Sequence, residues 1–528
     1  MKKIDKLKGQ YKAGSVTRRQ FMEGSLALGM TAAGASAFVS EAHAMTPKKG
    51  GHMKFGIGGG SNTDSLDPAA TVDVFMEMVN YGLRGHLTEV GQDGKLRGDL
   101  AESFESSPDA KTWVFNLRKD VEFHNGKTLD AEDVVASFQH HMGEDSKSAA
   151  KGTLAGVESI TADGNSTVVF ELKEGSADFP YAASDPHLCL LPAKDGSIDW
   201  ESGVGTGAYM LENLEPGINA VLKRNPNYWK EGAGNFDSVE VLAIKDVVAR
   251  TTALDSGSIH AMNRCDLKTV HLLKRNPSLR VEQETGTQHY SLPMNTTAAP
   301  FDNNDVRMAL KYAVDRQDMV KKILRGYGRV GNDHPISPVN PCFDSELPIR
   351  EYDPEKAKFH LKKAGLSSLQ VDLSTSDAAF AGAPDAALLF KEHAAKAGID
   401  INVIREPADG YWSNVWKNKP WAMSYWSGRP TEDWMFSITY AAGAPWNETY
   451  WEHKRFNKLL VEARAELEQA KRCDMYHEMQ RIVRDEGGTV IPMYASYVFA
   501  MSTSVSHGQM AANWDMDGNK AIERWWFA

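Results

Sequence analysis

The stretch GDLAESFESSPDAKTWVFNLRKDVEFHNGKTLDAEDVVASFQ, residues 98–139, predicts two paired strands followed by a helix. Residues 113–117 alternate as a β-strand does, and residues 109–111 form the turn before them. A glycine turn then leads to Asp130, whose carboxylate can cap a helix by accepting from the backbone near Asp133. This local pattern specifies a fold and names no ligand.

Short strands and helices also alternate along the rest of the chain. We expect strands at residues 53–59 and 167–172, which are rich in β-branched and aromatic residues. Residues 305–324 place their apolar side chains on one helical face, with Asp305 as the expected cap. Residues 353–365 begin with Asp-Pro and end with Gly, as helices commonly do. The chain is therefore predicted to be a mixed α/β protein.

The composition is that of a globular protein of two or three domains. The chain has 528 residues, of which 42% are hydrophobic and 24% charged, and its formal net charge is -11. This acidity argues against nucleic acid or an anionic membrane surface as the main partner.

The first 44 residues have the pattern of an export signal. A basic start is followed by an uncharged stretch that is too short to span a bilayer, and residues 42–44, Ala-His-Ala, fit a cleavage site. Residues 17–22, TRRQFM, resemble the twin-arginine motif, although a capping threonine beside two unrelated arginines would look the same. We therefore expect a twin-arginine-type signal peptide at residues 1–44, export by the twin-arginine translocase, and a periplasmic mature protein.

Local signatures of catalysis, cofactor binding and metal binding are weak. The GVGTGA run at residues 203–208 is followed by a predicted strand rather than by the helix that a dinucleotide site needs. The sixteen histidines have no metal-ligand spacing, and residues 515–519, DMDGN, fit a turn better than a calcium loop. We therefore predict no catalytic residue, cofactor or metal site. The cysteines allow three pairings or none: Cys189, Cys265, Cys342 and Cys473.

Several segments together resemble one protein family, the extracytoplasmic solute-binding proteins of the peptide, opine and nickel class of ABC importers. They follow the family's order and span nearly the whole chain after residue 44. The segments are DSLDPA (64–69), the opening stretch (98–139), GTGAYML (205–211), RNPNYW (224–229), PFDNNDVRMALKYAVDR (300–316) and YDPEKAKFHLKKAG (352–365).

The resemblance implies an α/β periplasmic-binding-protein-like fold of two lobes, with an extra subdomain in the first lobe and a hinge that the chain crosses twice. It also implies a monomer that carries a small molecule between its lobes to a permease in the inner membrane. The expected bounds are 45–288 completed by 503–528 for lobe I, about 83–198 for its subdomain, 289–502 for lobe II, and crossings near 284–297 and 499–508.

The resemblance also places residues 425–436, YWSGRPTEDWMF, in lobe II facing the cleft. Trp426, Ser427 and Gly428 resemble the family's residues there, and the next position of peptide-binding members commonly holds an Asp that pairs with the peptide's ammonium group. This chain has Arg429 at that position. An arginine cannot accept an ammonium group, so the ligand is expected to present a different group to it.

Arginine keeps its charge in a partly desolvated cleft and offers a planar fork of donors that suits a carboxylate. We therefore expect Arg429 to bind an anionic group of the ligand. The alternative is an internal ion pair with Glu432 or Asp433, and the two arrangements can also alternate as the lobes open and close.

Other candidate ligand contacts are aromatic walls, amide groups and carboxylates. The carboxylates would meet an ammonium group if the ligand is a zwitterion. The aromatic candidates are Trp426, Trp434, Tyr411 and Trp412, the amides are Asn62 and Asn295, and the carboxylates are Asp64 and Asp433.

The leading hypothesis is a non-enzymatic carrier of a short peptide or another carboxylated, opine-like solute. A carrier of a nickel or other metal complex is the first alternative. A periplasmic hydrolase that uses Glu432 and Asp433 is the second, and it is disfavoured because adjacent residues point in different directions.

Overall fold

The computed structural model describes residues 24–25, 28, 47–71, 73–143, 145–194 and 196–528. The predicted twin-arginine motif at residues 17–22 and the predicted cleavage site at residues 42–44 lie outside the described residues. Within the described part of the chain, none of the helices has the length and apolar character needed to span a bilayer.

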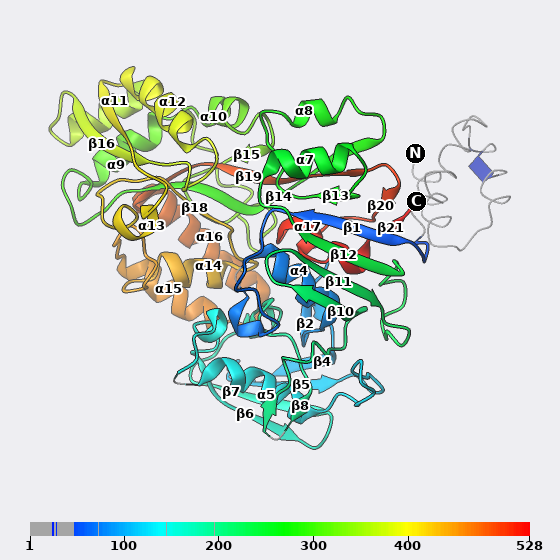
Figure 1. Ribbon diagram of the computed structural model, residues 1–528. Coiled ribbons are helices and arrows are strands. Elements are labelled where there is room, and N and C mark those ends of the chain that lie inside the picture. Colours follow the sequence, from blue (N-terminus) through cyan, green and yellow to red (C-terminus); the bar gives the residue numbers. More distant parts are fainter. Residues whose placement is uncertain (1–23, 26–27, 29–46, 72, 144, 195) are drawn as a thin grey trace.

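A nine-stranded mixed sheet forms the centre of the molecule (Figure 1). β1 runs parallel to β12 and β13, and the other neighbours are antiparallel. The strand order is β10 (Tyr209–Glu215), β11 (Asn219–Arg224), β12 (Ser238–Ala243), β1 (His52–Ile57), β13 (Ala261–Met262), β19 (Thr489–Ser502), β14 (Leu279–Pro293) and β18 (Ser424–Trp426), with β15 (Gly328–Val330) paired to β19.

Lobe I is the part that packs around β1 and β10–β13. Met53, Phe55 and Ile57 alternate along β1 and are fully buried, as expected for the predicted strand. Its helices and short strands are η1 (Pro68–Ala70), α4 (Val74–Leu83), α7 (Val247–Asp255), α8 (Val270–Leu273), α17 (Asp515–Gly518), α18 (Ala521–Arg524), β20 (Val505–Ser506) and β21 (Trp526–Phe527).

The subdomain lies below lobe I in Figure 1 and has its own core around Phe115, Phe138 and Phe170. Asp130 caps α5 by accepting from the backbone of Glu132 and Asp133, which confirms the predicted cap. The elements are β2 (Thr88–Val90), β3 (Leu96–Gly98), β4 (Ala101–Ser106), β5 (Thr112–Leu117), α5 (Ala131–Met142), η2 (Ala149–Lys151), β6 (Val157–Asp163), β7 (Thr167–Leu172), α6 (Phe179–Ala182), β8 (Ala193–Lys194) and β9 (Ser197–Ile198).

Lobe II is the mainly helical part at the left in Figure 1, and it has two cores, one around Phe390 and Trp421 and one around Phe436 and Phe456. Its elements are α9 (Asn304–Tyr312), α10 (Arg316–Lys322), α11 (Pro354–Lys363), β16 (Leu369–Thr375), α12 (Ala383–Ala395), β17 (Ile399–Arg405), α13 (Tyr411–Asn414), α14 (Glu432–Thr439), α15 (Lys454–Ala465) and α16 (Gln469–Glu486).

The predicted long helix at residues 305–324 is wrong in one respect, because it is broken into α9 and α10. Asn303, not Asp305, caps α9 by accepting from the backbone N–H of Asp305. Asp315 caps α10 by accepting from Asp318 N. The carboxylate of Asp305 instead accepts from His360 Nδ1 at 2.8 Å, so it ties α9 to α11.

Two long antiparallel strands, β14 and β19, connect the lobes (Figure 1). Leu279 of β14 packs in a lobe I core, while Leu292 of the same strand packs in lobe II. β19 runs back from Met493 in the lobe II core to Met501 in the lobe I core. Because both strands contribute to both lobes, they form the structural link across which the lobes face each other.

One disulfide joins Cys342 to Cys473 on α16. Cys189 and Cys265 are buried free thiols. The sequence left the pairing open, and in the structure two of the four cysteines form a disulfide while the other two remain free.

Candidate functional site

A cleft of about 1190 Å³ lies between the lobes and is the candidate ligand site. Its walls come from lobe I, lobe II and both crossing strands, so lobe movement would change it. The volume is on the order of the ligand pockets known in proteins. Residues that line it include Arg264, Tyr290, Phe380, Tyr425, Ser427, Tyr497 and Asp515.

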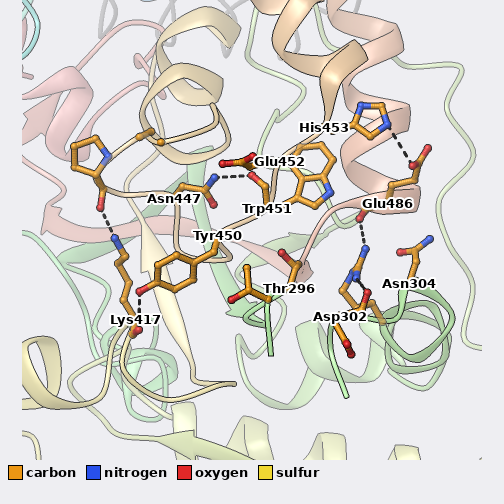
Figure 2. Close-up of a pocket in the computed structure, with 15 residues that line it drawn as sticks. Thr296, Asp302, Asn304, Lys417, Asn447, Tyr450, Trp451, Glu452, His453 and Glu486 are labelled. Carbon is orange, nitrogen blue, oxygen red and sulfur yellow. Dashed lines mark hydrogen bonds and ion pairs between the residues drawn. The ribbon is translucent and has the colours of Figure 1, made fainter. Parts of the chain in front are cut away.

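A second cavity of about 870 Å³ lies within lobe II (Figure 2). Its polar groups are largely bonded to each other: Tyr450 Oη donates to the Lys417 carbonyl at 2.9 Å, and His453 Nε2 lies 3.3 Å from Glu486 Oε2. This cavity takes no residue from lobe I. The interlobe cleft is therefore the better candidate for a site that closes on a ligand.

Strand β18 determines which side chains of the predicted segment face the cleft. Tyr425 and Ser427 line it. Trp426, the last residue of the strand, lies between them in the chain and points to the opposite face, where its Nε1 donates to Glu448 Oε2 at 3.0 Å and its ring packs on a lobe II core. The expectation that Trp426 lines the cleft therefore does not match the structure.

Gly428 allows the loop after β18 to lie against β14. Its φ is +79°, and an added Cβ would lie 2.3 Å from Thr287 Cβ. The loop is held there because Thr287 Oγ1 donates to the Ser427 carbonyl at 2.8 Å. A glycine is required at this position by both the backbone conformation and the close approach.

Arg429 follows the cleft residue Ser427 by two positions but is not itself among the residues that line the cleft, and it forms no ion pair with a carboxylate among the described side chains. Its Nη1 donates to the Gly428 carbonyl at 2.7 Å, and its Nε is buried with no partner. The guanidinium carbon lies 5.5 Å from the centre of the Trp434 ring, within cation–π range. Burial lowers the pKa of Arg429, and the negative charge of Asp185 opposes that shift.

The predicted internal pair of Arg429 with Glu432 or Asp433 is not formed. Asp433 Oδ1 accepts from Arg464 Nε at 3.1 Å, and Glu432 Oε1 accepts from Cys342 N at 2.6 Å. Both carboxylates therefore hold α14 to its neighbours. Burial raises the pKa of Glu432 to about 8 and that of Asp433 to about 6. Asp433 is thus engaged inside lobe II rather than free to meet a ligand's ammonium group.

The predicted aromatic wall is only partly assembled. Trp434 lies under Arg429, as described above. Trp412 is 41% exposed, and its ring centre lies 5.7 Å from that of the cleft residue Tyr425. Tyr411 is instead a core residue whose hydroxyl donates to the Met423 carbonyl at 2.7 Å.

The predicted polar contacts from the loops are used locally. Asn295 Oδ1 accepts from Thr297 N at 2.9 Å. Asp64 Oδ2 accepts from Ser61 N at 2.8 Å and so shapes the loop after β1. Asn62 is exposed in the same loop. The structure does not place these three side chains among the residues that line the cleft.

Sequence reasoning missed most of the charged groups of lobe I that act on the cleft residue Tyr497. Burial raises the pKa of Tyr497, and the charges of Asp515, Arg264, Glu77 and Arg429 also act on it. These residues come from four separate segments, so no local motif unites them. The one available signal was a lone acid in the apolar run VFMEMV of α4.

Comparison with known proteins supports this geometry. The sequence profile of bacterial extracellular solute-binding proteins, family 5, matches residues 95–448. The probable D,D-dipeptide-binding periplasmic protein DdpA of Escherichia coli K12 is 28% identical over 495 residues, which are 88% of this chain and 92% of that protein. The glutathione-binding protein GsiB of Salmonella choleraesuis is 24% identical over 462 residues, 85% of this chain and 90% of that protein.

Solved structures show the same fold. The periplasmic binding protein DppA of Helicobacter pylori, in complex with the peptide STSA, has a TM-score of 0.74 and 24% identity, covering 91% of this chain and 99% of that one. AgaA of A. tumefaciens R10, in complex with agropinic acid, has a TM-score of 0.73 and 24% identity, covering 90% and 99%. These matches confirm the predicted α/β periplasmic-binding-protein fold.

The profile match covers more than half of the chain, and the interlobe cleft lies where two lobes can close on a solute. The chain therefore belongs to the bacterial extracellular solute-binding proteins of family 5, the periplasmic, non-catalytic substrate-binding components of ABC importers.

Proposed function

We propose that this protein captures a small solute with an anionic group, such as a short peptide or an opine-like carboxylate, and delivers it to an ABC permease in the inner membrane. The observation that carries the proposal is Arg429, a half-buried cation two residues after the cleft residue Ser427, which has no ion-pair partner among the described carboxylates and whose Nε is buried without a hydrogen-bond partner. A buried charge without a partner is costly, and a bidentate carboxylate would satisfy it.

The ligands named for several similar proteins support this choice. They are a D,D-dipeptide, glutathione and agropinic acid, and each of these compounds carries a carboxylate. A neighbouring structure, NikZ of Campylobacter jejuni, holds Ni(L-His), whose histidine also carries one. An anion-binding arginine suits all four kinds of ligand, so Arg429 indicates an anionic group on the ligand and does not select one compound.

The test is the affinity of wild type and Arg429→Ala for four probes: D-alanyl-D-alanine, glutathione, agropinic acid and the Ni²⁺–L-histidine complex. For each probe that binds, the variant should weaken affinity about thirtyfold or more, since truncating one partner of a buried charge pair costs about 2 to 5 kcal/mol. Titration calorimetry gives both constants. Arg455→Ala, which removes an exposed arginine paired with Glu478, is the matched control. Equal affinity in wild type and Arg429→Ala would refute the proposal.

We also infer that residues 45–288 and 503–528 move as lobe I and residues 289–502 as lobe II, with the protein acting as a monomer. The division into lobes is supported by the strand pairing. Among the described strands, only β14 and β19 form a long pair that runs from the core of one lobe to the core of the other. Their register is irregular between Thr285 and His289, at the middle of the crossing, which is where bending would disturb the fewest ladder bonds.

We further infer export by the twin-arginine translocase. Replacing Arg18 and Arg19 together by lysine keeps the charge but removes the residue pair that this translocase reads. The precursor should then accumulate in the cytoplasm, as measured by cell fractionation and immunoblotting, whereas Lys12→Arg should be exported normally. Undiminished export of the double-lysine variant would rule out this route.

A further inference from the structure

Four aromatic side chains of lobe II follow one another as a row, which we call the aromatic row: Phe380, Tyr290, Tyr425 and Trp412. The rings of Phe380 and Tyr290 stack face to face, with their centres 3.8 Å apart and their planes 4° apart. Tyr290 lies directly opposite Tyr425 in the β14–β18 ladder, so the two side chains lie side by side on one face. Trp412 continues the row in an edge-to-face contact with Tyr425, with the ring centres 5.7 Å apart.

The aromatic row leads from a lobe II core into the interlobe cleft. Phe380, Tyr290 and Tyr425 are all among the residues that line the cleft. Phe380 is 6% exposed and belongs to the core, whereas Tyr425 is 40% and Trp412 is 41% exposed. Soluble proteins rarely leave a contiguous apolar surface open to water unless something binds there. Covering the outer rings of the row with an apolar group of a ligand would therefore be favourable.

One buried carboxylate fixes the direction of Tyr425. Glu448 Oε1 accepts from Ser424 Oγ at 2.6 Å, and its Oε2 accepts from Trp426 Nε1 at 3.0 Å. These two donors flank Tyr425 in β18, and holding both on the far face turns Tyr425 toward the cleft. Glu448 Oε1 also accepts from Trp416 Nε1 at 2.5 Å, just after α13, the helix that carries the outermost ring of the row. The exposed rings are therefore held in place before any ligand binds.

The lobe I side of the cleft has a different chemistry. Its lining residues include the charged side chains of Arg264, Lys268 and Asp515, and that of Arg264 is 60% exposed. Tyr497, on the crossing strand β19, also lines the cleft, and its hydroxyl has no hydrogen-bond partner within the described part of the chain. A solute in the cleft thus meets aromatic rings from lobe II and charged or polar groups from the other side. This arrangement suits an amphipathic solute.

The geometry of the aromatic row favours a ring on the ligand over a cation. Sites for ammonium-type cations enclose the cation among several ring faces, whereas these rings follow one another along one wall. Aromatic rings prefer offset-stacked or edge-to-face contacts with their centres about 4.5 to 7 Å apart. Trp412 and Tyr425 already make such a contact, and a further ring can extend the row in the same way.

We propose that the ligand carries an aromatic group, and that this group lies on the aromatic row with Tyr425 as its main contact. This inference rests on the proposed function and deepens it, because it names a second part of the same ligand. The polar groups of the ligand then face lobe I and the loop after β18. Tyr425 is thereby a specificity-determining residue, which selects solutes with a ring from solutes that share only the anionic group.

The test pairs a change in the ligand with a change in the protein, and titration calorimetry measures each affinity. Alanyl-phenylalanine is compared with alanyl-alanine, in the L,L and in the D,D forms, and N-benzoylglycine is compared with N-acetylglycine. In at least one pair, wild type should bind the compound with the ring about tenfold or more tightly. Tyr425→Ala should lose this preference and bind the ring-free compound as wild type does. Tyr425→Phe, which keeps the ring, should retain the preference.

Tyr450→Ala is the matched control. It removes a lobe II tyrosine of nearly equal exposure, 41%, that lines the second cavity instead of the cleft, and it should retain the wild-type preference. Two results would overturn the assignment: no preference of wild type for the ring in any pair, or an unchanged preference in Tyr425→Ala. If Arg429→Ala still weakens binding in that case, the proposed function stands and only the aromatic group fails. Absence of binding by all of these compounds would count against both. Thermal unfolding confirms that each variant is folded.

Discussion

Glu432 shows how a single buried acid makes stability depend on pH. It is 2% exposed and burial raises its pKa to about 8, whereas an unfolded glutamate titrates near 4.3. The folded chain therefore keeps a proton that the unfolded chain releases. This contribution to stability is fully present below the unfolded pKa and is lost as the pH rises through about 8.

Glu432→Gln should remove this loss, because the amide oxygen can still accept from Cys342 N and does not titrate. The free energy of unfolding of the variant, relative to wild type, should increase between pH 5 and pH 8 by more than about 1 kcal/mol, the value of roughly one pKa unit. Urea titrations at pH 5, 6, 7 and 8 measure it. Parallel pH profiles for the two proteins would contradict the expectation.

For single residues, the sequence was informative where a side chain departs from its family's pattern. Arg429 stood out for that reason, and in the structure it has no carboxylate partner among the described residues. The orientation of Trp426 was missed because it depends on which face of β18 points inward. That face is set by the pairing of β18 with His289 and Tyr290 of β14, which lie far away in the chain.

At the level of elements, the loop between β18 and α14 depends on Gly428. Gly428→Ala would meet two penalties, a positive φ of 79° and a contact with Thr287. Gly443→Ala is a matched control, since Gly443 has a φ of 73° and open space around it. The control should cost about 1 kcal/mol, and Gly428→Ala at least about 1 kcal/mol more. Chemical denaturation compares them, and equal costs would show that the contact with Thr287 is relieved easily.

Elements with strong local signals were predictable. Asp130 and Asp353 cap helices as expected, because a cap depends only on residues within one turn. The break between α9 and α10 was missed because an apolar stripe continues through it, although Asp315 starts a new helix there. The β14–β19 pairing joins segments about 200 residues apart, and periodicity within one segment contains no information about a partner at that distance.

At the level of the whole molecule, the subdomain touches lobe II in the structure. Arg472 Nη1 on α16 donates to Asp178 Oδ1 at 2.9 Å, and both side chains are nearly buried, at 12% and 11% exposure. Ala177 N donates to the Arg464 carbonyl at 2.7 Å. Arg464 in turn holds Asp433, at the start of the helix that follows Arg429. The contact between the subdomain and lobe II is therefore connected to the loop that carries the predicted anion site.

This contact should favour the closed arrangement of the lobes even without ligand. Asp178→Asn removes one charge of a nearly buried pair and leaves the other uncompensated, which typically costs a few kcal/mol. Because Arg472 regains water only when the lobes separate, the cost falls on the closed state and shifts the population toward the open one. The radius of gyration of the ligand-free variant, measured by small-angle X-ray scattering, should exceed that of wild type. The reversed pair Asp178→Arg with Arg472→Asp should move it back, whereas either single reversal should not. Identical radii for all five proteins would show that the pair contributes nothing to closure.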